Sequence, residues 1–135
     1  MAVNLLVNID VDDLDRATAF YCHGLGLQVG RHFGDWLELV GGTSPIYLLP
    51  KDSGSAISPA SSETRDYARH WTPVHLDFVV DDIDAALARA KAAGAKVERE
   101  PTDHVYGRLA LLADPFGNGF CLLQFNGSGY DAIAK

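Results

Sequence analysis

The chain repeats one short pattern of residues at an interval of 69 positions, and this repeat limits the folds that are open to it. The pattern Val11-Asp12-Asp13-Leu14-Asp15-Arg16-Ala17 returns as Val80-Asp81-Asp82-Ile83-Asp84-Ala85-Ala86. Each copy follows a run typical of a β-strand and begins a run typical of a helix that ends at glycine. Because the period is half of the chain, we predict two similar modules packed together, with a ligand site where they face each other.

Both halves show the same order of predicted elements. Apolar and alternating runs in the first half predict one helix, which begins at Asp12 or Asp13, and strands over 3–11, 27–31, 35–40 and 46–49. The second half predicts a helix over 83–93 and strands over 74–80, 96–100, 108–112 and 120–125. The predicted fold class is therefore α+β, with tandem βαβββ modules that form one pseudo-symmetric domain.

We predict that residues 1–135 form a single domain whose two modules span 1–50 and 73–126. Residues 51–72 are rich in Ser, Pro and Gly and are longer than a usual connection, so they read as a linker or a lid, with a short helical turn near 63–69. Residues 127–135 are small and polar, and we expect a short, loosely held tail.

The charge balance limits the partners of the chain. The net charge is −7, both halves carry an acidic excess, and no cluster of Lys and Arg occurs. Nucleic acids and anionic membranes bind basic surfaces, so neither is an expected partner. An acidic protein mildly favours a cationic ligand, and the hydrophobic content of 47% predicts a folded globule.

The cysteines and the N-terminus predict a cytoplasmic location. Cys22 and Cys121 form no CxxC pair and indicate no disulfide framework, which is typical of a reducing compartment. The first residues lack the basic and apolar regions of a signal peptide, and no run is long enough to span a membrane.

Four short motifs carry a resemblance to a known family. Asp13-Leu14-Asp15-Arg16-Ala17 is followed by Phe20-Tyr21 and Gly24-Leu25-Gly26-Leu27, and Ala113-Asp114-Pro115-Phe116-Gly117-Asn118 precedes the last predicted strand. In this order, inside a duplicated βαβββ pattern, they resemble the vicinal oxygen chelate superfamily, which includes glyoxalase I, extradiol dioxygenases, and bleomycin- and fosfomycin-resistance proteins. The resemblance implies two modules whose sheets curl into an open cup, usually within a homodimer.

The resemblance also implies where a divalent metal would bind. Metal-binding members take ligands from the first and fourth strands of each module, and these positions fall on Leu6, Tyr47, His75 and Cys121. Leucine cannot ligate a metal, and tyrosine is an uncommon ligand in this setting. Because His75 and Cys121 alone are too few for a firm site, we predict no metal and no cofactor.

Within the cup that the resemblance implies, we expect a ligand site around His75. His75 is either a pocket histidine satisfied by a neighbour or a polar group that contacts ligand. Asp77 lies two residues after His75 and hence on the same face of the strand, and the repeat makes Asn8 its counterpart. Two interpretations remain open for Asp77 and Asn8: they face the cup, or they face a dimer interface or buried water. Cys121 is either a small packed hydrophobe or a nucleophile with His75 as its base.

Aromatic residues make up the rest of the predicted site. Tyr47, Phe33 and Trp36 are predicted to line the cup, where flat rings suit planar or cationic ligands. Trp71 and Tyr106 are predicted in or beside it, and His104 is a loop residue that could line its mouth. Ordinary packing is the competing interpretation for each ring. The paired aspartates of the repeat are read as helix caps rather than as catalytic groups.

Three functions remain open from the sequence. The leading one is a metal-independent small-molecule binding protein of the bleomycin-resistance type, which sequesters an aromatic and possibly cationic ligand. The alternative is a metal-dependent enzyme, a glyoxalase-like lyase or a dioxygenase, with His75 as one ligand. The third is a cofactor-free enzyme or an accessory subunit. A homodimer is expected in each case.

Overall fold

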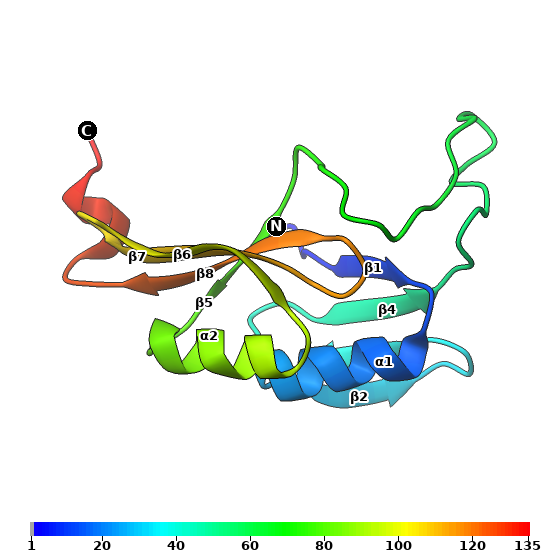
Figure 1. The fold of residues 1–135 in the computed structure, drawn as a ribbon, viewed down its shortest axis with the longest axis horizontal. Helices are drawn as coiled ribbons and strands as arrows, with labels where there is room; N and C mark the ends of the chain where they lie inside the picture. Colours follow the sequence, from blue (N-terminus) through cyan, green and yellow to red (C-terminus); the bar gives the residue numbers. More distant parts are fainter. Residues whose placement is uncertain (1) are drawn as a thin grey trace.

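The computed structural model describes residues 2–135 and contains two four-stranded sheets and two main helices (Figure 1). The first module comprises β1 (Val7–Val11), α1 (Leu14–Ala19), a π-helical turn (Phe20–Gly24), β2 (Gln28–His32), β3 (Leu37–Val40) and β4 (Ile46–Pro50). The second comprises β5 (Leu76–Val79), α2 (Ile83–Ala92), β6 (Lys96–His104), β7 (Gly107–Ala113) and β8 (Gly119–Phe125), followed by a 3₁₀-helix (Gly129–Ala132). The predicted α+β fold class with tandem βαβββ modules is confirmed.

The two repeated Asp-Asp pairs cap the helices, as predicted. The Asp13 carboxylate accepts a hydrogen bond from the Arg16 amide at 3.0 Å, and the Asp82 carboxylate accepts one from the Ala85 amide at 3.2 Å. These carboxylates satisfy amides that have no partner inside the helix and lie at the positive end of its dipole. The local pattern of the repeat therefore fixes where both helices begin.

The strand order and register are the same in the two sheets. The orders are β1-β4-β3-β2 and β5-β8-β7-β6, with the first and last strands of each module parallel. Asn8 lies opposite Tyr47 in the first sheet, and Asp77 lies opposite Cys121 in the second. The interval of 69 residues thus relates equivalent positions on the first strands, Asn8 and Asp77, whereas the equivalent positions on the fourth strands, Tyr47 and Cys121, lie 74 residues apart.

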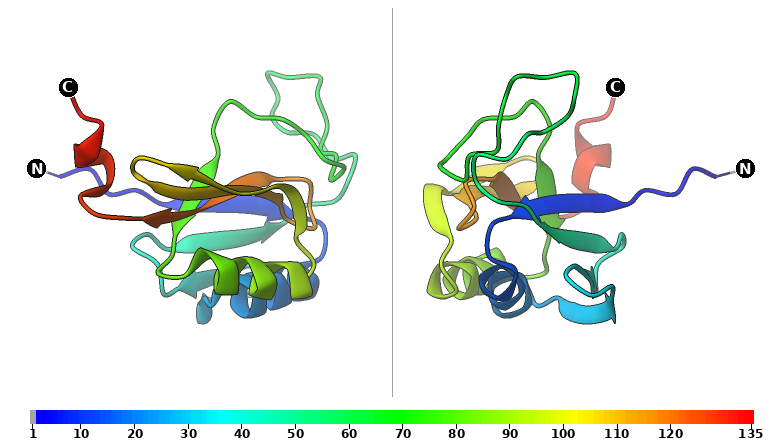
Figure 2. Two further views of the ribbon diagram at one scale, coloured as in Figure 1. Left: turned by 60° about the vertical axis from the view of Figure 1, so that its left-hand side comes forward. Right: turned by 90° about the vertical axis from the view of Figure 1, so that its right-hand side faces the viewer.

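One apolar core joins the modules. Helices α1 and α2 lie side by side in the angle between the two sheets, as Figures 1 and 2 show. Phe20 and Leu48 of the first module and Ile83 and Leu122 of the second are at most 1% exposed and belong to this core. Because the helices fill the space between the sheets, the other face of each sheet is left open and points away from that of its neighbour.

A buried hydrogen bond also links the modules. The Tyr21 hydroxyl donates to the Asp114 carboxylate at 2.5 Å, and burial, together with the Asp114 charge, raises the pKa of Tyr21 well above its usual value. Asp114 also accepts from the amides of Phe116 and Asn118 and from the Asn118 side chain. The predicted Asp-Pro-Phe-Gly-Asn turn is therefore held by buried hydrogen bonds, one of which connects the two modules, and we call this set of hydrogen bonds the lock.

The segment 51–72 contains no helix, so the predicted turn near 63–69 is wrong. An isolated bridge between Ala56 and Thr64 closes a hairpin-like loop, and ion pairs from Arg65 to Asp10 (2.8 Å) and from Arg69 to Glu98 (2.7 Å) attach it to both modules. Its backbone also approaches Gly117, where a Cβ would lie 2.1 Å from the Ala68 carbonyl oxygen. Arginine anchors outweigh the weak helical tendency of this stretch.

Residues 127–135 are exposed except for Gly129, and part of this predicted tail is ordered against the second sheet. They form the 3₁₀-helix Gly129–Ala132, and Tyr130 packs on the ring of Phe125 with a centroid distance of 4.8 Å. One aromatic side chain therefore attaches a segment whose composition is otherwise small and polar. In the described part of the chain, 2–135, no helix is long and apolar enough to cross a membrane.

Candidate functional site

The open face of the second sheet brings His75, Asp77 and Cys121 together. His75 and Asp77 are two residues apart around the start of β5, and Cys121 is the register partner of Asp77 on β8. The potential ligand atoms of all three side chains lie within 4.8 Å of one another, and His75 Nε2 lies 3.2 Å from Asp77 Oδ1. These three residues, which we call the β5–β8 cluster, were all selected from the sequence.

The environment of Cys121 holds its thiol in the protonated form. Burial first, and then the neighbouring Asp77 carboxylate, raises the pKa of Cys121 to about 12. A nucleophilic cysteine needs the opposite shift, because the thiolate is the reactive species. This geometry disfavours the cofactor-free enzyme that uses Cys121 and His75 as nucleophile and base.

A cavity of about 220 Å³ lies beside the β5–β8 cluster. The second module contributes His75, Glu98 and Cys121 to its lining, and the linker contributes Arg69 and Trp71. Trp71 is 80% exposed, so its ring is free to meet a ligand. This volume is below the range of about 300–1,000 Å³ usual for small-molecule sites, so the cavity alone is small for a drug-sized ligand.

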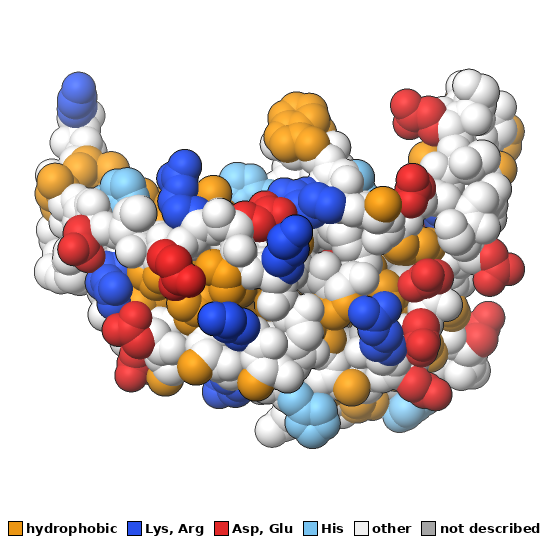
Figure 3. Space-filling view, viewed as in Figure 1, with side chains coloured by type: hydrophobic (Ala, Val, Ile, Leu, Met, Phe, Trp, Pro, Cys, Tyr) orange, Lys and Arg blue, Asp and Glu red, His pale blue; other side chains and the backbone are white. Residues whose placement is uncertain are grey.

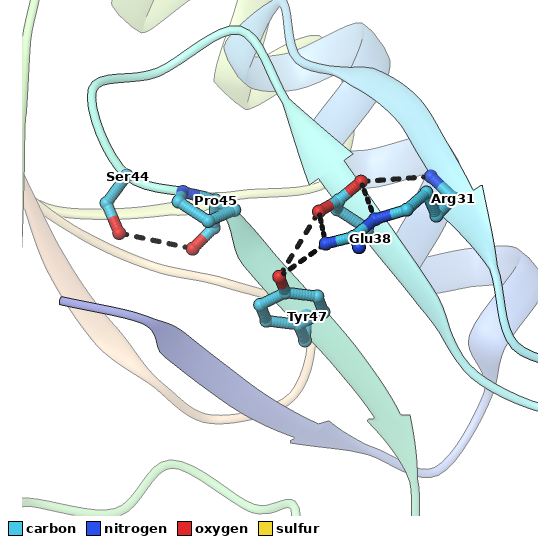
Figure 4. Close-up of polar contacts among 5 residues, drawn as sticks. All are labelled: Arg31, Glu38, Ser44, Pro45 and Tyr47. Atoms are coloured by element: carbon cyan, nitrogen blue, oxygen red, sulfur yellow. Dashed lines mark hydrogen bonds and ion pairs between the residues drawn. The ribbon is translucent and has the colours of Figure 1, made fainter. Parts of the chain in front are cut away.

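The open face of the first sheet carries a polar triad that the sequence did not reveal (Figure 4). Arg31 forms an ion pair with Glu38 at 2.7 Å and donates to the Tyr47 hydroxyl at 3.1 Å, while that hydroxyl donates to Glu38 at 3.2 Å. Glu38 is only 7% exposed. The Arg31 hydrogen bonds lower the pKa of Glu38 to about 2, so its carboxylate is ionised at neutral pH.

Glu38 and Arg31 were missed although the sequence holds a signal for one of them. Glu38 is the only charged residue between Leu37 and Val40 in an apolar strand, and an inward carboxylate there requires a partner. Arg31 has no comparable local signal, because β2 and β3 become neighbours only when the sheet forms. The sequence predicted that Tyr47 contacts ligand. In the structure, its hydroxyl group is held by hydrogen bonds to Arg31 and Glu38.

Phe33 and Trp36 form an aromatic wall beside the triad. Their rings stack with centroids 4.1 Å apart, and the Trp36 ring lies 5.8 Å from that of Tyr47. The Arg31 guanidinium lies 5.4 Å from the centre of the Phe33 ring. The three rings chosen from the sequence are therefore neighbours, and together with Arg31 and Glu38 they form what we call the module-1 face.

The structure does not bring the module-1 face and the β5–β8 cluster together. Across residues 2–135, no hydrogen bond, ion pair or ring contact joins the two sets.

Asn8 is exposed on β1 opposite Tyr47, and it is the uncharged counterpart of Asp77. His104 is the last residue of strand β6, not a loop residue as predicted, and it stacks on Tyr106.

The four metal positions implied by the resemblance do not fit a shared metal site. Leu6 is 55% exposed and offers no donor atom, and the Tyr47 hydroxyl is already bonded to Arg31 and Glu38. His75 and Cys121 lie with Asp77 on a single sheet. The first module therefore supplies no free ligand to a metal held between the modules.

Comparisons with known proteins agree with this fold. A family model described as a glyoxalase-like domain matches residues 6–123. The anthracycline biosynthesis protein DauV of Streptomyces sp. (strain C5) is 34% identical over 131 residues. That match covers 95% of this chain but 43% of DauV, so the chain spans less than half of the relative.

Two solved structures share the architecture. A glyoxalase/bleomycin resistance protein/dioxygenase family enzyme from Burkholderia phytofirmans PsJN is 26% identical, with a TM-score of 0.70 over 90% of this chain and 97% of that one. The antibiotic-binding protein TnmS3 from Streptomyces sp. CB03234 has a TM-score of 0.62 at 24% identity, over 93% and 99% of the two chains. Together with the family model, which spans both βαβββ modules, these matches establish that the chain belongs to the glyoxalase-like family of the vicinal oxygen chelate superfamily.

Proposed function

We propose that the protein binds a planar aromatic small molecule that carries a positive charge, and that it does so without a metal ion. The observation that carries this proposal is the stacked Phe33–Trp36 wall on an open sheet face. Flat rings bind planar ligands by stacking, and they attract cations through their negative faces. The names of DauV, an anthracycline biosynthesis protein, and of TnmS3, an antibiotic-binding protein, suggest the ligand class.

Charge supports a cationic ligand. The Glu38 carboxylate is neutralised by Arg31. Among the described residues 2–135, Asp77 has only His75 within ion-pair distance, and its side chain is 35% exposed. The face drawn in Figure 3 carries acidic and basic side chains intermixed, with no continuous basic area. A net charge of −7 adds a weak long-range attraction for cations.

The proposed site forms between two copies of the chain. The open faces of the two sheets point away from each other, so one copy cannot place its Phe33–Trp36 wall over its own β5–β8 cluster. Exposed apolar side chains flank the edge strands β1 and β5, namely Leu5 (71%), Leu6 (55%), Val74 (76%) and Val79 (59%). A homodimer would cover these residues and join each module-1 face to the partner's β5–β8 cluster.

The direct test is a titration with doxorubicin, a planar anthracycline with one amino group. We expect one bound molecule of doxorubicin per chain. Binding is measured by the quenching of doxorubicin fluorescence. The neutral aglycone doxorubicinone is the matched control and should bind more weakly. Light scattering should give the mass of a dimer. Failure of wild-type protein to bind either compound at micromolar concentration would refute the proposed ligand class.

Mixing two variants tests the shared cup. Trp36→Leu damages the module-1 face, and Asp77→Asn damages the β5–β8 cluster. After unfolding and refolding as a mixture, about half of the dimers contain both variants, and each of these holds one intact cup. About a quarter of all cups should then regain wild-type affinity. If each cup lies within one chain, the mixture will regain none.

A second candidate function rests on the β5–β8 cluster itself. An imidazole, a carboxylate and a thiol within 4.8 Å resemble the donor set of a zinc site with an open position. Metal content measured after incubation with Zn, Mn, Ni or Fe(II) and desalting tests this candidate. One metal per chain, lost in His75→Ala, would favour a metal-dependent enzyme. Metal well below stoichiometry would favour the binding protein.

We also propose a cytoplasmic location, in keeping with the two free thiols.

A further inference from the structure

The C-terminal segment lies on the open face of the second sheet. Figures 1 and 2 show the red 3₁₀-helix on the side of β7 and β8 that is opposite α2. Phe120 and Leu122 of β8 point into the core with the helices, so Cys121, Leu123 and Phe125 point to the open face. The segment therefore shares a face with the β5–β8 cluster.

Burial on this face shows how closely the segment packs. Leu123 is 1% exposed although it lies outside the core between the sheets and the helices. Gly129 is buried, and a Cβ there would lie 3.2 Å from the Phe125 ring. The Asn126 amide donates to the Tyr106 carbonyl at 3.0 Å, which holds the start of the segment against the β6–β7 hairpin.

Tyr130 places an aromatic ring beside the β5–β8 cluster. Its ring lies 4.8 Å from that of Phe125 and 5.1 Å from that of Tyr106, which in turn stacks on His104 at 5.1 Å. Burial, and then the nearby Asp77 carboxylate, raises the pKa of the Tyr130 phenol. Half of Tyr130 nevertheless remains exposed, so the ring has a free surface.

We infer that Tyr130 and Tyr106 form a second aromatic wall of the binding site, built by the C-terminal segment together with the turn between β6 and β7. This inference rests on the proposed function and specifies which groups take the aromatic part of the ligand. A planar ring held there lies within reach of the Asp77 carboxylate, so stacking and charge attraction act on the same molecule. The tail is then a determinant of ligand choice and not a terminal extension.

Doxorubicin binding to three variants tests the inference. Tyr130→Leu keeps apolar bulk but removes the ring, and we expect Kd to rise about five- to tenfold. Tyr130→Phe keeps the ring and should stay within about twofold of wild type, as should the neighbouring control Asp131→Asn. If wild-type protein binds and Tyr130→Leu binds equally well, the inference is overturned while the proposed function stands. If wild-type protein does not bind, the proposed function itself has failed.

A measurement on the unaltered sequence guards against misfolding of the leucine variant. In protein with ¹³C-labelled tyrosine, the ring resonance of Tyr130 is assigned as the one missing from Tyr130→Phe. We expect it to shift on addition of doxorubicin, whereas Tyr67, which donates to the Lys51 carbonyl in the linker, should not shift. Binding without a shift at Tyr130 would overturn the inference.

Discussion

The two open sheet faces share one backbone design and differ in chemistry. Asn8 and Tyr47 occupy the same register in the first sheet as Asp77 and Cys121 occupy in the second. In the first, Arg31 neutralises the buried carboxylate of Glu38 and aromatic rings dominate. In the second, a partly exposed carboxylate lies beside a cavity. Duplication thus gave two equivalent scaffolds whose side chains diverged into a stacking wall and a charged anchor.

The largest expected effect comes from the lock that fixes the two faces relative to each other. Asp114 accepts four hydrogen bonds, one of them from Tyr21 of the first module. Asp114→Ala should lower the free energy of unfolding by about 3 kcal/mol, because it leaves buried donors without partners.

Urea denaturation measures this change, and Tyr21→Phe is its control. That variant removes a single donor and should cost only about 1–2 kcal/mol. Equal losses in the two variants would mean that the turn itself adds nothing to the Tyr21 contact.

The aromatic wall should give the next largest effect. Trp36→Leu removes one ring of the stacked pair and should weaken doxorubicin binding about tenfold, with little change in the free energy of unfolding. Trp36→Phe keeps a ring and should retain most of the affinity. An equal loss of affinity in both variants would indicate that size, not stacking, matters on the module-1 face.

The charged anchor should show selectivity between ligands. Asp77→Asn should weaken binding of doxorubicin about three- to fivefold, because the side chain is partly exposed and its attraction to a cation is screened. The neutral doxorubicinone should bind both proteins alike. If the two compounds lose affinity equally, Asp77 acts through packing or hydrogen bonding and not through charge.

The free energy of unfolding should depend on pH in different ranges for the two faces, at acid pH for the first face and at alkaline pH for the second. The pKa of Glu38 is lowered to about 2, so its stabilisation is present above pH 4.5 and is lost as pH falls toward 2. The pKa of Cys121 is raised to about 12, so its contribution is present below pH 9 and is lost as pH rises toward 12.

Two variants assign these slopes to their residues. Glu38→Gln should reduce the slope on the acid side only. Cys121→Ser should reduce the slope on the alkaline side only, and part of that slope should remain because the pKa of Tyr21 is also raised. Unfolding by urea at a series of pH values measures both. A loss of both slopes in one variant would show that the two faces are coupled through the core.

Some features of the site could be predicted from the sequence because they depend on short-range rules. Strand alternation placed His75 and Asp77 on one face, and the family resemblance pointed to Cys121, which lies beside them. Phe33, Trp36 and Tyr47 were chosen as rings of the cup and are neighbours in space. Arg31, Glu38 and the role of the C-terminal segment were missed, because each depends on contacts between residues that are distant or on different strands.

The sequence by itself determined the duplicated α+β fold, the starts of both helices and the equivalence of the two sheets. Those features follow from local capping, from alternation along strands and from an internal repeat. Only the tertiary structure decided that the helices pack between the sheets and turn the open faces apart. It also decided that Tyr130 returns to cover the second face. The reason is physical: packing of distant surfaces selects among arrangements that local rules leave equally open.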